Sequence, residues 1–212
     1  MTQLSIKETL VRIATAAPVI PVITIRNITH AKPLAETLIE NGLSVLEVTL
    51  RTECALDAIA IMSKVEGAFV GAGTLRSAGD IARVRDAGAA FGLSPGSPHH
   101  LLSAANSAAF PFVPGVASAT EAMEAAELGY TFQKFFPAEA SGGAQALGGL
   151  AAPLSDIRFC PTGGVSESNA LSYLSLPNVV CVGGSWIATD EAMLAGNWQE
   201  IGARAKEAAD LR

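Results

Sequence analysis

The stretch VLEVTLRT, residues 45–52, combines the alternation of a β-strand with charge on the face that should be buried. Successive side chains of a strand point to opposite faces. One face here carries Leu46, Val48 and Leu50, and the other carries Glu47, Thr49 and Arg51. We expect the apolar face to pack against helices, so that Glu47 and Arg51 point to the interior, with Glu47 deeper and Arg51 nearer the carboxyl end of the strand.

Similar apolar and β-branched runs recur along the chain and total eight. They are VIPVITI (19–25), VLEVTL (45–50), AFVGAGTL (68–75), FGLSPG (91–96), PFVPGV (111–116), TFQKFFP (131–137), IRFCPTGG (157–164) and VVCVGGSW (179–186). Helical patterns separate them, for example residues 30–42 with Gly42 at the expected C-cap, and residues 118–130 with Ser118 or Thr120 as N-cap. Strands alternating with helices predict βαβ units and a parallel sheet.

Eight such units predict an α/β fold of the (β/α)8 TIM-barrel type, with residues 6–16 (IKETLVRIATA) as an additional N-terminal helix. An open doubly wound sheet is the alternative, although it rarely needs eight such even units. Linkers, low-complexity tracts and charge blocks are lacking, so we expect one domain over residues 1–212.

Composition narrows the functional classes. The net charge of −6 gives no basic footprint for nucleic acid, and the three cysteines suit neither a disulfide framework nor a cysteine-based zinc site. The apolar run at residues 17–25 is too short for a membrane span and is broken by Pro18 and Pro21. The N-terminal residues lack the pattern of a signal peptide. We therefore expect a cytoplasmic protein that binds neither nucleic acid nor membrane.

The stretch TFQKFFP, residues 131–137, places one lysine among three phenylalanines. Alternation puts Phe132, Lys134 and Phe136 on one face of the strand. If that face is interior, burial favours the neutral amine, which is the form that attacks a ketone to give an imine. This strand alone leaves open a lysine whose stem lies along the outer surface. An interior Glu47 favours the chemical role, although a buried ion pair that only orders the core is the alternative for that carboxylate.

Glycine pairs close the last two predicted strands, in CPTGG (160–164) and VGGSW (182–186). The loops after the seventh and eighth strands of such barrels often bind phosphate, because glycine lets backbone N–H groups approach an anion. A third glycine-containing turn, GAGTL, places Thr74 at the end of the third strand. The sequence shows no His, Asp or Glu cluster with metal-ligand spacing, so we expect neither a metal nor another cofactor.

Six motifs occur in one order between residues 47 and 186: EVTLRT, GAGT, SPG, KFFPAE, FCPTGG and GGSW. Together they closely resemble the 2-keto-3-deoxy-6-phosphogluconate (KDPG) aldolase family. The resemblance implies a homotrimeric, cofactor-free class I aldolase that splits a phosphorylated keto acid into pyruvate and glyceraldehyde 3-phosphate. It also implies activity on 4-hydroxy-2-oxoglutarate (KHG), which gives pyruvate and glyoxylate.

The resemblance further implies roles for individual residues of these motifs. Lys134 would form the Schiff base, and Glu47 would be the general acid and base. The substrate-binding residues would be Arg51 and Thr74 at the pyruvyl carboxylate, Phe136 and Thr162 on the walls, and Gly163, Gly164, Gly184 and Ser185 at the phosphate.

Three other functions use the same architecture. A phosphosugar epimerase or isomerase would share the phosphate loops but has no need of Lys134. A related aldolase would act on the C4-epimeric 6-phosphogalactonate substrate. A binding module without catalysis would not need both Lys134 and Glu47.

Overall fold

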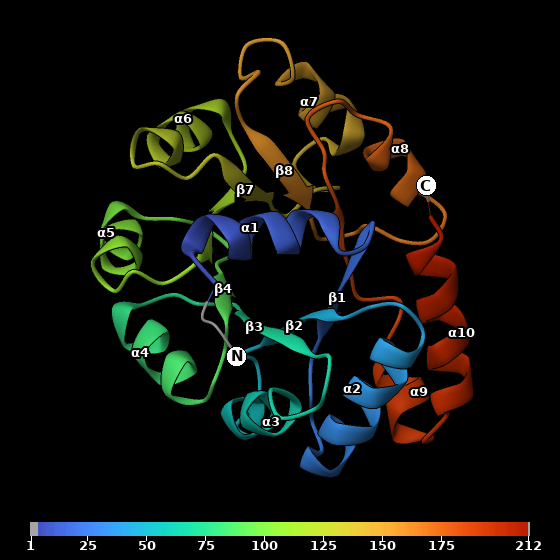
Figure 1. Cartoon of the computed structure of the whole chain (residues 1–212). Helices are drawn as coiled ribbons and strands as arrows, with labels where there is room; N and C mark the ends of the chain where they lie inside the picture. Colours follow the sequence, from blue (N-terminus) through green and yellow to red (C-terminus); the bar gives the residue numbers. More distant parts are fainter. Residues whose placement is uncertain (1–3, 212) are drawn as a thin grey trace.

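The protein is described here as a computed structural model covering residues 4–211, in which strands and helices alternate along nearly the whole chain (Figure 1). The strands are β1 (Val19–Ile23), β2 (Val45–Thr49), β3 (Phe69–Gly73), β4 (Phe91–Leu93), β5 (Phe112–Val113), β6 (Gly115–Val116), β7 (Phe132–Phe135), β8 (Arg158–Pro161) and β9 (Val182–Gly184). Each of the eight predicted runs contains strand residues, and the fifth run contains two short strands. The predicted strand positions are therefore confirmed.

The strands form two parallel sheets. Six strands make one curled sheet in the order β5-β4-β3-β2-β1-β9, and the other three pair as β6-β7-β8. Between β5 and β6 lies Pro114, which has no N–H to donate to a ladder. The predicted α/β class with parallel strands is confirmed. The larger sheet is a six-stranded half-barrel, and the structure does not show the single eight-stranded sheet that the sequence predicted.

The helices lie around the outside of the strands (Figure 1). They are α2 (Ala31–Glu40, preceded by the 3₁₀ turn η1, Ile28–His30), α3 (Ala55–Met62), α4 (Ala78–Asp86), α5 (His99–Ser107), α6 (Ala119–Glu127), α7 (Gly143–Gly149), α8 (Ala170–Leu174), α9 (Asp190–Leu194) and α10 (Trp198–Ala209). Ser118 is the N-cap of α6 and accepts a hydrogen bond from the Glu121 N–H, which decides between the two predicted caps. Within residues 4–211, no helix is long and apolar enough to cross a membrane.

The additional N-terminal helix is confirmed as α1 (Ile6–Thr15), which lies across one end of the ring of strands (Figure 1). Ser5 and Glu8 form a capping box at its start, and Thr9 and Ile13 are its buried residues. Ile13 belongs to an apolar cluster with residues from the amino ends of several strands, including Val45, Phe91 and Phe132. Helix α1 therefore closes the amino-terminal end of the ring.

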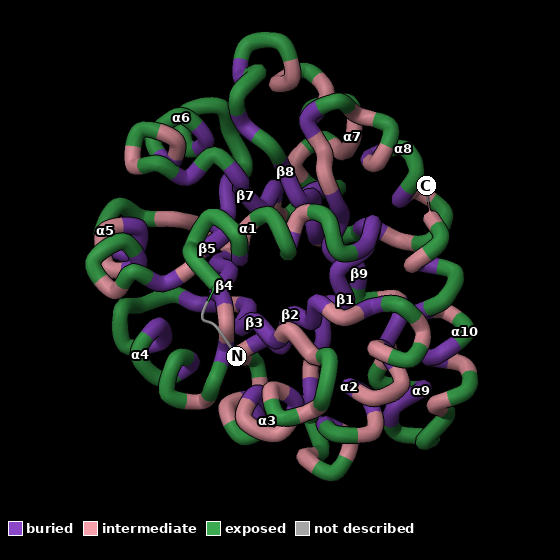
Figure 2. The backbone as a smooth tube through the Cα atoms, viewed as in Figure 1, coloured by how far each residue is buried: buried purple, intermediate pink, exposed green. Residues whose placement is uncertain are grey.

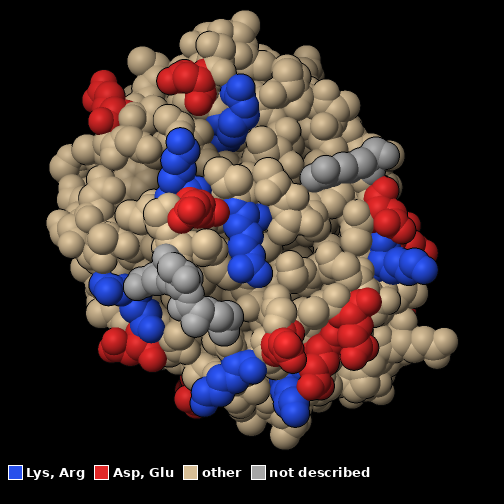
Figure 3. All heavy atoms as spheres, in the orientation of Figure 1, with Lys and Arg blue, Asp and Glu red and all other residues tan. Residues whose placement is uncertain are grey.

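A second and larger apolar cluster fills the space between the strands and the outer helices. Burial in Figure 2 follows this arrangement, since the strands are purple and exposed positions gather on the outer helices. On the face that carries α1, positive and negative side chains are intermixed among uncharged surface (Figure 3). The closed end thus shows no broad surface of one charge.

Candidate functional site

A buried ion pair crosses the interior from one sheet to the other. Lys134 of β7 donates a hydrogen bond from Nζ to Oε1 of Glu47 on β2 over 2.7 Å. Their side chains are only 5% and 2% exposed. A buried charge is stable only when it is paired, because water no longer solvates it. The two residues that the sequence singled out for catalysis are therefore in direct contact.

Space for the Glu47 carboxylate is provided by Gly73, the last residue of β3. A Cβ atom added at Gly73 would overlap Glu47 Oε1 and come within 2.9 Å of its Cγ and Cδ. Strand β3 pairs directly with β2, so the carboxylate lies over the backbone of its neighbour. Gly73, the second glycine of GAGT, therefore positions Glu47, a role that the sequence did not suggest.

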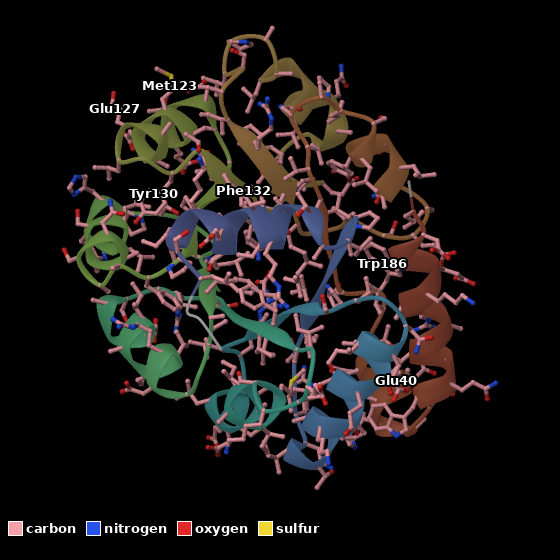
Figure 4. All side chains as sticks on the ribbon, in the orientation of Figure 1. Glu40, Met123, Glu127, Tyr130, Phe132 and Trp186 are labelled. Carbon is pink, nitrogen blue, oxygen red and sulfur yellow. The ribbon has the colours of Figure 1, made fainter. Side chains whose placement is uncertain are left out.

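Alternation along β7 is confirmed. Phe132 lies in the interior cluster beside α1, as its label in Figure 4 shows, while Phe135 packs on the helix side, edge-on to Phe159. Lys134 Nζ lies 5.6 Å from the centre of the Phe136 ring. An ammonium over an aromatic face is attracted by the ring quadrupole, so Phe136 contributes to holding the amine.

Gln133 faces the helices, on the side of β7 opposite to Lys134. It is fully buried, and its Nε2 donates to the carbonyl oxygens of Ala122 and Tyr130, both at 2.8 Å. These two hydrogen bonds offset the burial of the Nε2 group, whereas Oε1 is buried without a hydrogen-bond partner among residues 4–211.

A cavity of about 380 Å³ opens at the carboxyl ends of the strands. Six of the predicted substrate-binding residues line it, namely Arg51, Phe136, Thr162, Gly163, Gly164 and Ser185. Neither Lys134 nor Glu47 lines this cavity, since both side chains are almost fully buried. Phe136 links the two parts of the site, because its ring faces Lys134 and also forms cavity wall.

Two predicted residues are not part of this lining. Gly184 faces the ring of Trp186, which a Cβ atom at residue 184 would overlap, and Gly183 lines the cavity in its place. Thr74 follows β3 with a φ of 66°, a left-handed conformation that is uncommon for threonine. Such backbone strain concentrates at functional sites, but the Thr74 side chain is only half-buried and lies outside the cavity wall.

Five further residues of the lining were missed by the sequence reasoning, in addition to Gly183. They are Val22, Pro137, Glu139, Ala140 and Val165. Alternation along VIPVITI could have suggested Val22, while the turn after β7 carried no signal that Glu139 would return to the cavity.

The conformation of the CPTGG turn suits an anion. Gly163 and Gly164 have φ values of 97° and 80°, a conformation that favours glycine, and glycine has no side chain of its own to keep an anion from the backbone. Ser185 is exposed on the same wall and offers a hydroxyl donor. This side of the cavity can therefore bind a phosphate through backbone and hydroxyl donors.

Arg51 is exposed at the cavity mouth, where its guanidinium can bind a carboxylate bidentately. Together with Val22 and Ser185 it also lines a neighbouring opening of about 360 Å³.

No metal site is formed by the described residues 4–211, which contain no group of three His, Cys, Asp or Glu side chains that could hold an ion.

Comparisons with known proteins agree on one family. The model of the family described as "Aldolase: KDPG and KHG aldolase" matches residues 10–204. The 2-dehydro-3-deoxy-phosphogluconate aldolase of Pseudoalteromonas atlantica is 53% identical over 192 residues, covering 90% of this chain and 89% of that protein. The KHG/KDPG aldolase of Escherichia coli is 47% identical over 199 residues, or 93% of each chain.

Solved structures give the same result. The 2-keto-3-deoxy-6-phosphogluconate aldolase of Zymomonas mobilis, crystallised with 3-phosphoglycerate, matches with a TM-score of 0.90 and 43% identity over 100% of this chain and 98% of that one. The KDPG aldolase of Legionella pneumophila, with pyruvate captured as a covalent carbinolamine intermediate, has a TM-score of 0.92 and 41% identity over 99% and 100% of the chains.

Proposed function

The chain belongs to the KDPG and KHG aldolase family, and we propose that it cleaves 2-keto-3-deoxy-6-phosphogluconate to pyruvate and glyceraldehyde 3-phosphate through an imine on Lys134. It is a lyase, and 4-hydroxy-2-oxoglutarate is the second proposed substrate. The observation that carries the mechanism is the buried contact of 2.7 Å between Lys134 and Glu47, next to Phe136 in the wall of a cavity that can bind anions.

The contact itself provides the first proton transfer. The Lys134 ammonium passes a proton to the Glu47 carboxylate, which leaves a neutral amine to attack C2 of the keto acid. Glu47 then returns that proton to the carbinolamine hydroxyl, which leaves as water and gives a protonated imine. The protonated imine withdraws electrons from the C3–C4 bond, and the burial of Lys134 strengthens this electrostatic effect.

Cleavage uses the same carboxylate again. Glu47 accepts the proton of the C4 hydroxyl as the C3–C4 bond breaks, which releases the aldehyde and leaves an enamine on Lys134. Glu47 then gives the proton to C3, and hydrolysis of the resulting imine frees pyruvate and the amine. Arg51 binds the pyruvyl carboxylate with Thr74 nearby, and Phe136 and Thr162 flank the imine. The phosphate is bound at Gly163, Gly164 and Ser185, with Gly184 contributing through its backbone.

Trapping of the imine tests this proposal. Incubation with pyruvate and borohydride should fix a reduced adduct on the peptide that contains Lys134, as read by mass. Lys134→Met should abolish the adduct and lower turnover by at least about 1000-fold, because no other group supplies the covalent step. Lys64→Met, at an exposed lysine, is the control and should keep both. An adduct that survives Lys134→Met, or no adduct in the unaltered protein, would refute the mechanism.

We also propose that the two sheets are arcs of one (β/α)8 barrel. Consecutive strands β5 and β6 are separated only by Pro114, and isolated parallel bridges join Thr162 to Gly183 and Phe159 to Val179 across the other gap. From the family resemblance we further propose that the protein is a cytoplasmic homotrimer. Sedimentation analysis would measure the mass of this assembly in solution.

A further inference from the structure

The wall that would hold the phosphate contains a carboxylate, which calls for an explanation. Glu139 lines the same cavity as Gly163, Gly164 and Ser185. A phosphate monoester carries nearly two negative charges at neutral pH, so a free carboxylate beside it would weaken binding.

The stem of Glu139 is held against the glycine turn. Its backbone N–H donates to the Gly163 carbonyl at 3.0 Å. A Cβ atom added at Gly164 would come within 2.6 Å of Glu139 Cγ and 2.7 Å of its Cβ, so the stem fills the space above this glycine. The path of Glu139 and the shape of the turn therefore depend on each other.

The carboxylate end is held from outside the cavity. It accepts a hydrogen bond from the hydroxyl of Tyr173, which belongs to α8 and is fully buried. Both Glu139 Oε1 and Tyr173 Oη lie 3.6 Å from the position of a Cβ on Gly143, the first residue of α7. Glu139 is an exposed residue, and its charged end thus lies beside Gly143 of α7 and Tyr173 of α8.

Tyr173 is a dependable donor. Burial first, and then the Glu139 carboxylate, raise the pKa of Tyr173 above its ordinary value. The hydroxyl therefore stays protonated throughout the neutral range and continues to donate to Glu139.

We propose that Tyr173 is a positioning residue for substrate selection, which holds the Glu139 carboxylate against α7 and α8 and so keeps the phosphate end of the cavity free of negative charge. This inference rests on the proposed function, because it assigns the side of Gly163 and Gly164 to the phosphate. The inference predicts that Tyr173 controls binding of the phosphorylated substrate only. The shorter 4-hydroxy-2-oxoglutarate ends at C5 in a carboxylate and does not reach that wall.

The test is a comparison of two substrates in three variants. Tyr173→Phe removes only the hydroxyl, so Glu139 can turn into the cavity. KM for the phosphorylated substrate should rise about tenfold, the size expected for a like charge brought near the phosphate in a partly solvated site. kcat, and both constants for 4-hydroxy-2-oxoglutarate, should change by less than about twofold.

The double variant Glu139→Gln/Tyr173→Phe separates this role from a purely structural one. It lacks the same hydroxyl but has no charge to release, so KM for the phosphorylated substrate should return to within about twofold of the starting value. A loss that persists in the double variant, or that affects both substrates equally, would overturn the inference. Any loss of stability caused by removing the hydroxyl is common to both variants, and melting temperatures would measure it.

The other tyrosine of the chain, Tyr130, gives a matched control. Tyr130 also has a buried hydroxyl, which donates to the Leu102 carbonyl at 2.8 Å on the α5–α6 side of the molecule (Figure 4). Tyr130→Phe should leave KM for both substrates unchanged. If the unaltered protein turns over neither substrate, the proposed function fails; if it turns over both and Tyr173→Phe leaves every KM unchanged, only this inference fails.

Discussion

The two ends of the ring of strands differ in what fills them. At the amino-terminal end, α1 presents Ile13 to an apolar cluster that needs no charge. At the carboxyl-terminal end, Lys134 and Glu47 are buried together below a cavity lined by Arg51 and glycine turns. Apolar burial stabilises a fold in proportion to the area covered, whereas a buried ion pair contributes little net stability. The difference indicates that stability and chemistry depend on separate ends of the molecule.

The variant with the largest expected effect lies at the open, carboxyl-terminal end. Glu47→Gln keeps the shape of the side chain but removes its ability to accept a proton from Lys134 or from the C4 hydroxyl. We expect turnover to fall by about 100-fold or more, while trapping with pyruvate still detects the imine. Steady-state rates and borohydride trapping measure the two effects.

The matched control is Glu53→Gln, at an exposed glutamate two residues after Arg51, which should keep full turnover. Normal turnover in Glu47→Gln would mean that another group carries the proton, and the open end would then lose its assigned catalyst.

The closed end should respond in the opposite way. Ile13→Val removes one methylene from a fully buried side chain and should lower the free energy of unfolding by about 1 kcal/mol, with kcat unchanged. Urea denaturation measures the first and steady-state kinetics the second. Val11→Ala, on the exposed side of the same helix, should change stability by less than about 0.5 kcal/mol. A fall in kcat for Ile13→Val would show that the two ends are coupled.

The smallest expected effect depends on pH. Burial alone would raise the pKa of Asp80, at the start of α4, but hydrogen bonds from the Arg76 N–H and the Arg83 guanidinium outweigh it and hold that pKa below its usual range. A lowered pKa stabilises the fold above the unfolded value near 3.9, and the contribution is lost as pH falls through the folded value.

Asp80→Asn should therefore cost less than about 1 kcal/mol at neutral pH and reduce the loss of stability below about pH 4. Denaturation midpoints between pH 2.5 and 7 measure this. The effect of Ile13→Val should stay constant over that range, because an apolar contact does not titrate. An equal acid dependence in the Asp80→Asn variant and the unaltered protein would contradict the assignment.

Much of the fold could be predicted from sequence, because the two-residue period of a strand and the 3.6-residue period of a helix are both local patterns. Alternation along residues 45–52 and 131–137 placed Glu47, Lys134 and Phe135 on the correct faces. The break between β5 and β6 was not predicted, although the sequence contains its cause, since Pro114 cannot donate to a ladder.

The site was harder to predict wherever it depends on three-dimensional register. The contact between Lys134 and Glu47 joins strands 87 residues apart, and alternation gives only their faces. The cavity lining contains Gly183 rather than Gly184, a shift of one residue, which in a strand changes the face. Glu139 was missed because its position depends on Tyr173, a residue of a distant helix.

Gly73 has a consequence for sequence variation. The carboxylate of Glu47 occupies the place where any other amino acid would carry its Cβ atom. Alanine, the smallest replacement, already demands that space, so residue 73 has no conservative substitution as long as residue 47 is glutamate. Glutamate at residue 47 can therefore be inherited only together with glycine at residue 73.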